Sequence, residues 1–160
     1  MRGRIVQINI GNGGVPKLET DRCEVTADGL AGDRQAKPGI HGGIWKAVSL
    51  FSMEAIGRLA SEGHSVVPGS LGENVTLCGI DWSILVPGAN LRLGADVELV
   101  IASYATPCDS IRHGFSDGDL MHVHHKFRDS RLYARVLSPG WIAIDDFVRV
   151  RPHGSQAETI

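Results

Sequence analysis

The chain has 160 residues, of which 42% are hydrophobic and 21% charged, a composition typical of one globular domain. Its formal net charge of -2 gives no electrostatic reason to expect nucleic acid or an anionic membrane as a partner. The sequence contains no apolar run of signal-peptide or membrane-spanning length. Three widely spaced cysteines without a CxxC pair indicate free thiols in a reducing cytoplasm rather than disulfides or a zinc ribbon.

Short strand-like runs separated by glycine and proline dominate the chain. The first run, residues 4–10, alternates and ends at a glycine-rich turn, residues 11–14. Further runs rich in Val, Ile and Leu cover residues 47–51, 73–77, 90–93, 96–102, 131–137 and 146–151. Many short strands with few helices predict a mainly β fold, a closed or partly closed β-barrel with a few flanking helices.

One helix is predicted directly after the run at residues 47–51. Ser52 can cap its N-terminus and Gly63 ends it. Its apolar side chains recur at helical spacing at Met53, Ile56, Leu59 and Ala60. A second, shorter helix is expected to start at Pro107, because proline suits the first turn of a helix.

A Pro-Gly turn recurs in the second half of the chain, at residues 87–88 and 139–140. Each precedes a short alternating strand, a tight turn and another strand, which predicts two similar hairpins in one barrel. Residues 1–152 are expected to form a single domain. Residues 153–160 have little to bury and are expected to be a disordered tail.

The first segment with polar side chains that could contact a ligand is glycine-rich and extends from residue 29 to residue 48. Exposed N–H groups of glycines can form an anion-binding site. Arg34, His41 and Lys46 add donors suited to phosphate or a pterin-type heterocycle. The structural alternative is a loop in which Asp33 and Arg34 tie strands together.

A second segment, residues 69–75, places Glu73 and Asn74 at the beginning of a strand. The carboxylate and the amide could orient a ligand, or they could satisfy backbone groups at the strand start. Both interpretations remain open from the residues alone.

Cys108 is the cysteine with a candidate chemical role. It follows Pro107 where the shorter helix is expected, and the positive end of a helix favours the thiolate, which attacks electrophiles or binds soft metals. The alternative is a buried and inert thiol. Cys23 and Cys78 lie inside strand-like runs and are expected to have no chemical role.

Four histidines form a further candidate group. On a strand, His122 and His124 would share one face, a spacing found in some metal sites. Residues 114–129 are polar, however, and favour a solvated loop. A metal-binding protein built on His122, His124 and His125 is a third hypothesis. The histidines are His113, His122, His124 and His125.

The order of these motifs resembles the MOSC family, named from the C-terminal domain of molybdenum cofactor sulfurases. Gly-Asp-Arg, His-Gly-Gly-x-x-Lys-Ala-Val, Gly-x-x-Gly-Glu-Asn-Val and Pro-Cys follow one another. The match continues through residues 114–115, 131–137 and 139–140, so it covers residues 4–151. The chain is most similar to the small stand-alone bacterial members, such as the 6-N-hydroxylaminopurine resistance proteins.

The resemblance implies a β-barrel whose chemical centre is Cys108. In the family this cysteine is thought to ligate the molybdenum of a bound pterin cofactor, molybdopterin, or to carry sulfur as a persulfide. The implied function is reduction of N-hydroxylated small molecules, and the alternative is a non-enzymatic sulfur carrier or cofactor-delivery module. A redox-partner or sulfur-donor protein is expected, because the sequence has no Rossmann or flavin fingerprint. The implied pocket residues are Asp33, Arg34, His41, Lys46, Glu73 and Asn74.

The sequence departs from the family in two respects. Many small relatives carry an arginine shortly before the Pro-Cys, where this chain has residues 104–106, Tyr-Ala-Thr. One positive partner for the cofactor's oxyanions is then either absent or supplied by Arg34 or Arg112. The aminotransferase-like domain of the sulfurases, whose lysine holds pyridoxal phosphate, is also absent, so pyridoxal phosphate is not expected in this chain.

Overall fold

The computed structural model describes residues 2–11, 13, 15–34 and 43–154 of the chain. Its strands are β1 (Arg2–Ile10), β2 (Leu18–Thr20), β3 (Arg22–Thr26), β4 (Gly29–Leu30), β5 (Val48–Ser52), β6 (Val75–Cys78), β7 (Asn90–Leu93), β8 (Val97–Tyr104), β9 (Leu132–Ser138), β10 (Gly140–Ala143) and β11 (Phe147–Arg151). The helical segments are α2 (Met53–Ser61) and the short 3-10 helices η1 (Ile44–Lys46), η2 (Trp82–Ile84), η3 (Asp109–Gly114) and η4 (Leu120–Val123). The predicted mainly β class is confirmed.

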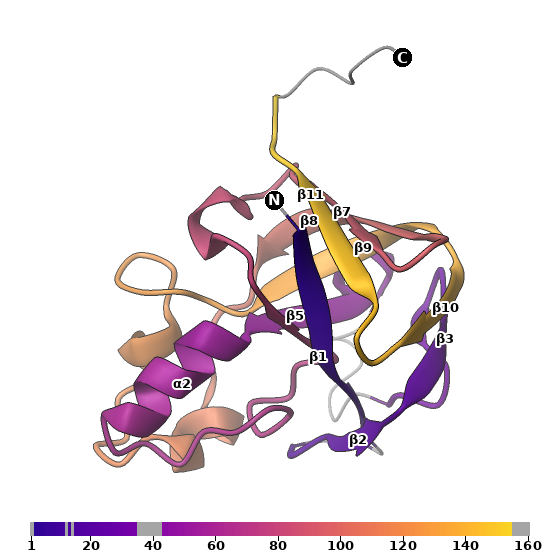
Figure 1. The fold of residues 1–160 in the computed structure, drawn as a ribbon. Coiled ribbons are helices and arrows are strands. Elements are labelled where there is room, and N and C mark those ends of the chain that lie inside the picture. The colour runs from indigo at the N-terminus through magenta and orange to yellow at the C-terminus, as the bar shows by residue number, and fades with distance from the viewer. Residues whose placement is uncertain (1, 12, 14, 35–42, 155–160) are drawn as a thin grey trace.

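Seven of the described strands close into a barrel (Figure 1). They follow the order β11-β7-β8-β9-β5-β6-β1, and pairing of β1 with β11 closes the ring. The β5–β6 pair is parallel, and α2 makes the connection between these two strands. Strand β2 extends the sheet beside β1, while β10, β3 and β4 form a separate three-stranded sheet. The predicted closed barrel is therefore confirmed.

The barrel interior is filled by side chains that alternate along each strand. On β8, Val97, Leu99 and Ile101 are at most 1% exposed, whereas Glu98 between them is exposed. On β1, Ile5 and Ile8 are both fully buried although they are three residues apart. A register shift within β1, opposite β6, makes this possible, because an extra residue moves the following side chains to the other face.

The two Pro-Gly segments adopt different structures. The first forms the predicted hairpin, in which β7 pairs with β8. The prediction of a second hairpin is wrong, because β10 pairs with β3, and β11 pairs with β1 and β7. At the turn between β10 and β11, Asp145 takes a positive φ of 71°, and its N–H donates to the carbonyl of Ile5. The two strands therefore lie in different sheets.

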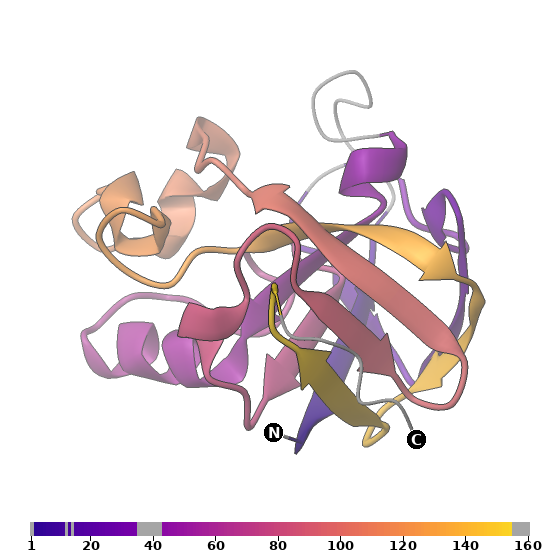
Figure 2. The ribbon, with the colours of Figure 1, turned by 90° about the horizontal axis from the view of Figure 1, so that it is seen from above.

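Helix α2 has the predicted ends. The Ser52 hydroxyl accepts a hydrogen bond from the N–H of Ala55 at 3.1 Å, and Gly63 follows the last turn with a φ of 93°. Figures 1 and 2 show α2 on the same side of the barrel as the segment that contains η3 and η4. Ion pairs of Arg58 with Asp129 and of Arg128 with Glu62 join these two segments. None of the described helices combines the length and apolar character needed to cross a bilayer.

Candidate functional site

Cys108 lies where the chain leaves β8 and enters η3. The predicted helix at Pro107 is found as η3, which begins at Asp109, and Cys108 occupies its N-cap position. The thiol is neither fully buried nor fully exposed. Its Sγ lies 2.8 Å from the hydroxyl oxygen of Ser110, at hydrogen-bonding distance. The sulfur is therefore accessible and has a polar neighbour.

Arg131 is a buried cation beside this thiol. The ladder between β8 and β9 continues past the end of β8, where the N–H of Ala105 donates to the carbonyl of Arg131 at 2.9 Å. The Arg131 guanidinium donates from Nη1 to the carbonyl of Leu71 at 2.9 Å, while its buried Nε has no hydrogen-bond partner. Burial lowers the pKa of Arg131, and electrostatic interactions with Tyr133, Glu73 and Cys108 oppose this shift. A buried guanidinium with one unused donor thus interacts electrostatically with Cys108.

Tyr133 and Lys46 continue this polar group along the outer face of β9. Tyr133 interacts electrostatically with both Arg131 and Cys108, and burial raises the pKa of its phenol. The ammonium of Lys46 lies over the Tyr133 ring, 5.2 Å from its centroid. Since Lys46 comes from η1, this short helix brings one of the predicted residues toward the neighbourhood of Cys108.

Asp33 and Asn74 are brought together in a buried hydrogen-bond network. The Asp33 carboxylate accepts bonds from Lys17 Nζ at 2.8 Å, from Asn74 Nδ2 at 3.0 Å and from the N–H of Gly11 at 2.9 Å. The Lys17 and Asp33 side chains are only 8% and 3% exposed. Asn74 also accepts from the N–H and the hydroxyl of Ser49. These two predicted residues connect β1, β5 and the loop after β4.

Glu73 is fully buried next to that network. Its Oε1 accepts from the N–H of Gly69 at 3.0 Å, and its Oε2 lies 3.4 Å from the hydroxyl of Thr76. Burial raises the pKa of Glu73 to about 7, against the opposing effect of Arg131. Arg131 therefore interacts with both Glu73 and Cys108, which are far apart in the sequence.

Comparison with known proteins assigns the family. A family model described as MOSC domain matches residues 37–149. The chain belongs to the MOSC domain family. No curated protein sequence matches this MOSC domain. The family resemblance of the four ordered motifs is thereby confirmed.

Solved structures share the fold of this MOSC domain over nearly its whole length. The YUAD protein from Bacillus subtilis is 17% identical, with a TM-score of 0.79, and the match covers 96% of this chain and 97% of the other. YiiM from Escherichia coli is 20% identical with a TM-score of 0.73, covering 98% and 72%. YiiM from Geobacillus stearothermophilus is 21% identical with a TM-score of 0.75, covering 95% and 76%. At these identities the likeness concerns the fold.

The other predicted cationic residues have different positions in this MOSC domain. The Arg112 guanidinium forms an ion pair with Asp109 at 2.6 Å and donates to the carbonyl of Gly118. Arg34 is exposed, and its backbone pairs with Gly11. His41 lies outside the described residues. Arg131, which begins the matched segment 131–137 but was not predicted as a pocket residue, is buried, and its carbonyl accepts a hydrogen bond from the N–H of Ala105.

The MOSC domain has a cavity of about 360 Å³ that neither Arg131 nor Cys108 lines. Ser130 and Leu132, the sequence neighbours of Arg131, both line it. Two ring-bearing side chains in its lining, Tyr104 and His125, stack with their ring centroids 4.3 Å apart and an interplanar angle of 3°. The cavity therefore offers a flat aromatic wall near the Cys108 segment, and no sequence motif indicated it.

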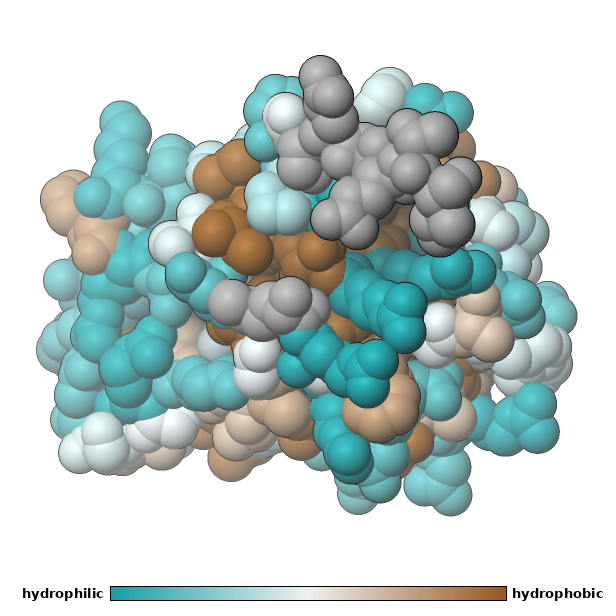
Figure 3. Space-filling model, turned by 45° about the horizontal axis from the view of Figure 1, so that its top comes forward, coloured by the Kyte–Doolittle hydropathy of each residue, from teal (hydrophilic) through white to brown (hydrophobic). Residues whose placement is uncertain are grey.

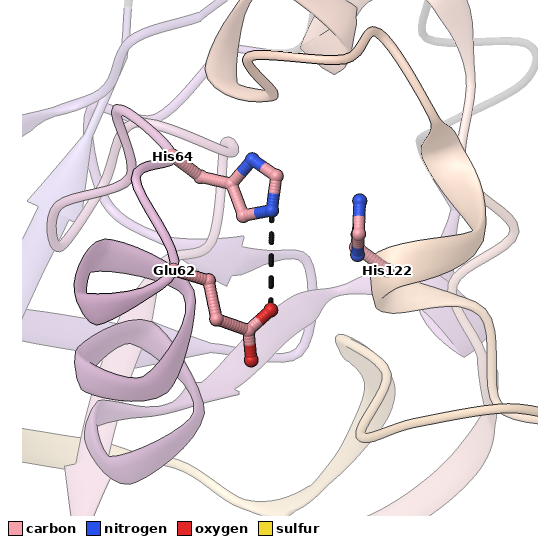
Figure 4. A group of neighbouring side chains, drawn as sticks. All are labelled: Glu62, His64 and His122. Atoms are coloured by element: carbon pink, nitrogen blue, oxygen red, sulfur yellow. Dashed lines mark ion pairs between the residues drawn. The ribbon is translucent and has the colours of Figure 1, made fainter.

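The histidines at 122, 124 and 125 do not gather as metal ligands in the described part of the chain. His122 lies instead near Glu62 and His64, as Figure 4 shows. The N–H of Ser116 donates to His64 Nδ1 at 3.1 Å, which leaves the ring proton of neutral His64 on Nε2. A protonated Nε2 is a donor and not a metal ligand.

The other two members of this cluster are also hydrogen-bonded. Both carboxylate oxygens of Glu62 accept from Arg128 at 2.7 Å, and His122 Nε2 lies 2.7 Å from an Asp117 carboxylate oxygen. His122 lies in the short 3-10 helix η4, and His124 is its C-cap, so the two histidines do not share the face of a strand. The cluster therefore has a structural explanation without a metal ion.

Proposed function

We propose that this MOSC domain binds a molybdenum cofactor at Cys108 and reduces N-hydroxylated compounds there. The observation that carries the proposal is a partly exposed thiol that interacts electrostatically with a buried guanidinium whose Nε has no hydrogen-bond partner, Arg131. Molybdenum accepts thiolate sulfur, and the phosphate of a pterin cofactor matches a guanidinium. The donor set beside Cys108 therefore fits such a group.

The protein's own residues would bind and orient the cofactor. Cys108 Sγ would be the metal ligand, and the Ser110 hydroxyl, 2.8 Å away, would donate a hydrogen bond to that sulfur. The Arg131 guanidinium would face an anionic part of the cofactor, and Lys46 would add positive charge from η1. When bound, the molybdenum supplies the two-electron chemistry that reduces the substrate.

The cavity that contains Tyr104 and His125 would suit a flat substrate, although neither Arg131 nor Cys108 lines it. Its stacked Tyr104 and His125 offer an aromatic surface on which a planar base could lie. A separate donor protein would deliver electrons, because the sequence has no fingerprint of a nicotinamide or flavin site.

Molybdenum analysis of the purified protein tests this proposal. The chain is expressed in cells with an intact cofactor pathway, as wild type, Cys108→Ala and Cys78→Ala. The Cys78 variant is the matched control, because this thiol is also partly exposed but lies on β6. We expect molybdenum in the wild type and in the control and its loss in Cys108→Ala. No molybdenum in the wild type, or equal amounts in all three proteins, would falsify the proposal.

A second candidate function is sulfur transfer, favoured by the contact between Cys108 Sγ and the Ser110 hydroxyl. In that reaction the Cys108 thiolate attacks the outer sulfur of a persulfide on a cysteine desulfurase and releases the donor's thiolate. Intact mass spectrometry after incubation with a desulfurase and cysteine would detect the added sulfur. The carrier function predicts an adduct on the wild type that Cys108→Ala lacks, and no adduct on either protein contradicts it.

A further inference from the structure

Two neighbouring histidine rings join the loop after α2 to the segment that contains η3 and η4 (Figure 4). The ring centroids of His64 and His122 lie 4.3 Å apart, and Phe115 packs against both rings. We call the contact made by His64, Phe115, Ser116 and His122 the histidine joint. The surface on this side of the molecule, to the left in Figures 1 and 3, carries mainly hydrophilic residues. Water therefore reaches the rim of the joint at His122, which is partly exposed.

His64 is held in the joint by a hydrogen bond that only the neutral ring can accept. Its side chain is 4% exposed, and its Nδ1 accepts from the N–H of Ser116 at 3.1 Å. A protonated histidine carries donors on both ring nitrogens, so a proton on Nδ1 would set two donors against each other. Burial disfavours the added charge as well. Protonation of His64 therefore requires the contact with Ser116 to open.

His122 is the member of the joint that can take up a proton without breaking a contact. Its Nε2 lies 2.7 Å from a carboxylate oxygen of Asp117. The N–H of Asp119 and the His122 ring lower the pKa of Asp117, so this carboxylate is ionised and favours a positive charge on His122. The carboxylate of Asp119 also lies within 4.8 Å of the coordinating atoms of this pair and acts in the same direction.

A second positive charge, on His64, would then lie next to the first. One nitrogen of each ring lies within 4.8 Å of a nitrogen of the other. The carboxylate nearest to His64 is that of Glu62, 4.0 Å from Nε2, but both of its oxygens accept from Arg128 at 2.7 Å. Because the Arg128 charge offsets that of Glu62, the closed joint has little to compensate a charge on His64.

We propose that the histidine joint is a pH-sensitive contact that is closed at neutral pH and opens as the pH falls. The direction follows from linkage, because the open joint binds a proton on His64 that the closed joint excludes. The change is confined to residues 115–123. On one side the N–H of Ser65 donates to the carbonyl of Gly114 at 2.8 Å, and on the other the ion pairs at residues 128 and 129 do not involve histidine.

The position of the joint connects it with the candidate site. In the chain, residues 115–123 lie between η3, which follows Cys108, and residues 125–130, which line the cavity. Loss of the joint therefore loosens the connection between these two parts of the molecule. The proposal concerns this contact alone and holds whatever the reaction at Cys108.

Amide hydrogen exchange read by mass spectrometry tests the proposal on the full chain. Protection is measured at about pH 7.5 and about pH 5, with labelling times corrected for the slower intrinsic exchange in acid. The test variant is His64→Asn, whose side-chain carbonyl can accept from Ser116 and cannot be protonated. The control is His113→Asn, which removes an exposed histidine from η3.

We expect the wild type and the control to lose about tenfold in protection over residues 115–123 at the lower pH, while His64→Asn keeps its protection. His122→Gln keeps a donor for Asp117 but carries no charge, so its loss should be smaller than that of the wild type. This second variant decides the question if His64→Asn does not fold. No loss in the wild type, a loss of the same size in both variants, or an equal loss along the whole chain would overturn the proposal.

Discussion

Glu73 contributes a pH-dependent part of the stability of this MOSC domain. Its burial raises its pKa from the ordinary 4.5 to about 7, so the folded protein binds this proton more strongly than the unfolded chain does. The contribution of Glu73 is therefore fully present below pH 4.5 and is lost as the pH rises through about 7. At about 1.4 kcal/mol per pH unit the loss amounts to about 3 kcal/mol.

The variant Glu73→Gln tests this reasoning, because the amide keeps the shape of the side chain and cannot ionise. Its carbonyl oxygen can still accept from the N–H of Gly69. The free energy of unfolding, measured by urea denaturation from about pH 4 to about pH 8, should rise relative to the wild type by about 3 kcal/mol over that range.

An exposed carboxyl supplies the control. Glu24 on β3 is exposed, and Glu24→Gln should follow the wild-type pH dependence throughout. A constant difference in the free energy of unfolding between Glu73→Gln and the wild type at all pH values would refute the assignment of this pH dependence to Glu73. A difference that shrinks toward high pH would do the same.

Three further substitutions test other parts of the structure. Arg131→Met removes a buried charge but keeps the bulk of the side chain. The molybdenum content should therefore fall about tenfold, while the free energy of unfolding stays within about 1 kcal/mol of the wild-type value. A wild-type molybdenum content in this variant would contradict the role proposed for Arg131. Asp33→Ala leaves the Lys17 charge buried and unpaired and should lower the free energy of unfolding by about 3 to 5 kcal/mol, whereas a loss below about 1 kcal/mol would contradict a strong buried pair. Gly29→Ala places a Cβ against the backbone carbonyl oxygen of Ala47 at a φ of 119°, whereas Gly63→Ala at a φ of 93° meets open space. In thermal denaturation, Gly29→Ala should lower the free energy of unfolding by several kcal/mol and Gly63→Ala by about 1 kcal/mol. Equal losses in the two variants would count against a close approach of the backbone at Gly29.

The strands of the barrel could be predicted because each has an apolar inner face. Periodicity along β7 and β8 is visible in the sequence, and it also indicated the helix after Ser52. Strands β2 and β4 have only three and two residues, so no periodic pattern can develop in them. The failed second hairpin has a similar cause. Its two strands find partners in β3 and β1, and no local pattern reports a partner so far away in the sequence.

The candidate site could be predicted only in part. Cys108 was placed before a short helix, because proline and cysteine at a helix start leave a local signature. Arg131 was missed, since an arginine at the beginning of an apolar run is more often exposed, and its burial results from the loop at Leu71 packing over it. The network of Asp33 with Lys17 also depends on contacts between separate loops, which sequence spacing does not contain.

X-ray absorption at the molybdenum edge tests the central proposal most directly. The cofactor-loaded wild type and the variant Cys108→Ser are compared, because serine would offer the metal an oxygen in place of sulfur. The proposal predicts one more sulfur neighbour around molybdenum in the wild type than in the variant. The same number of sulfur neighbours in both proteins would contradict Cys108 as the ligand.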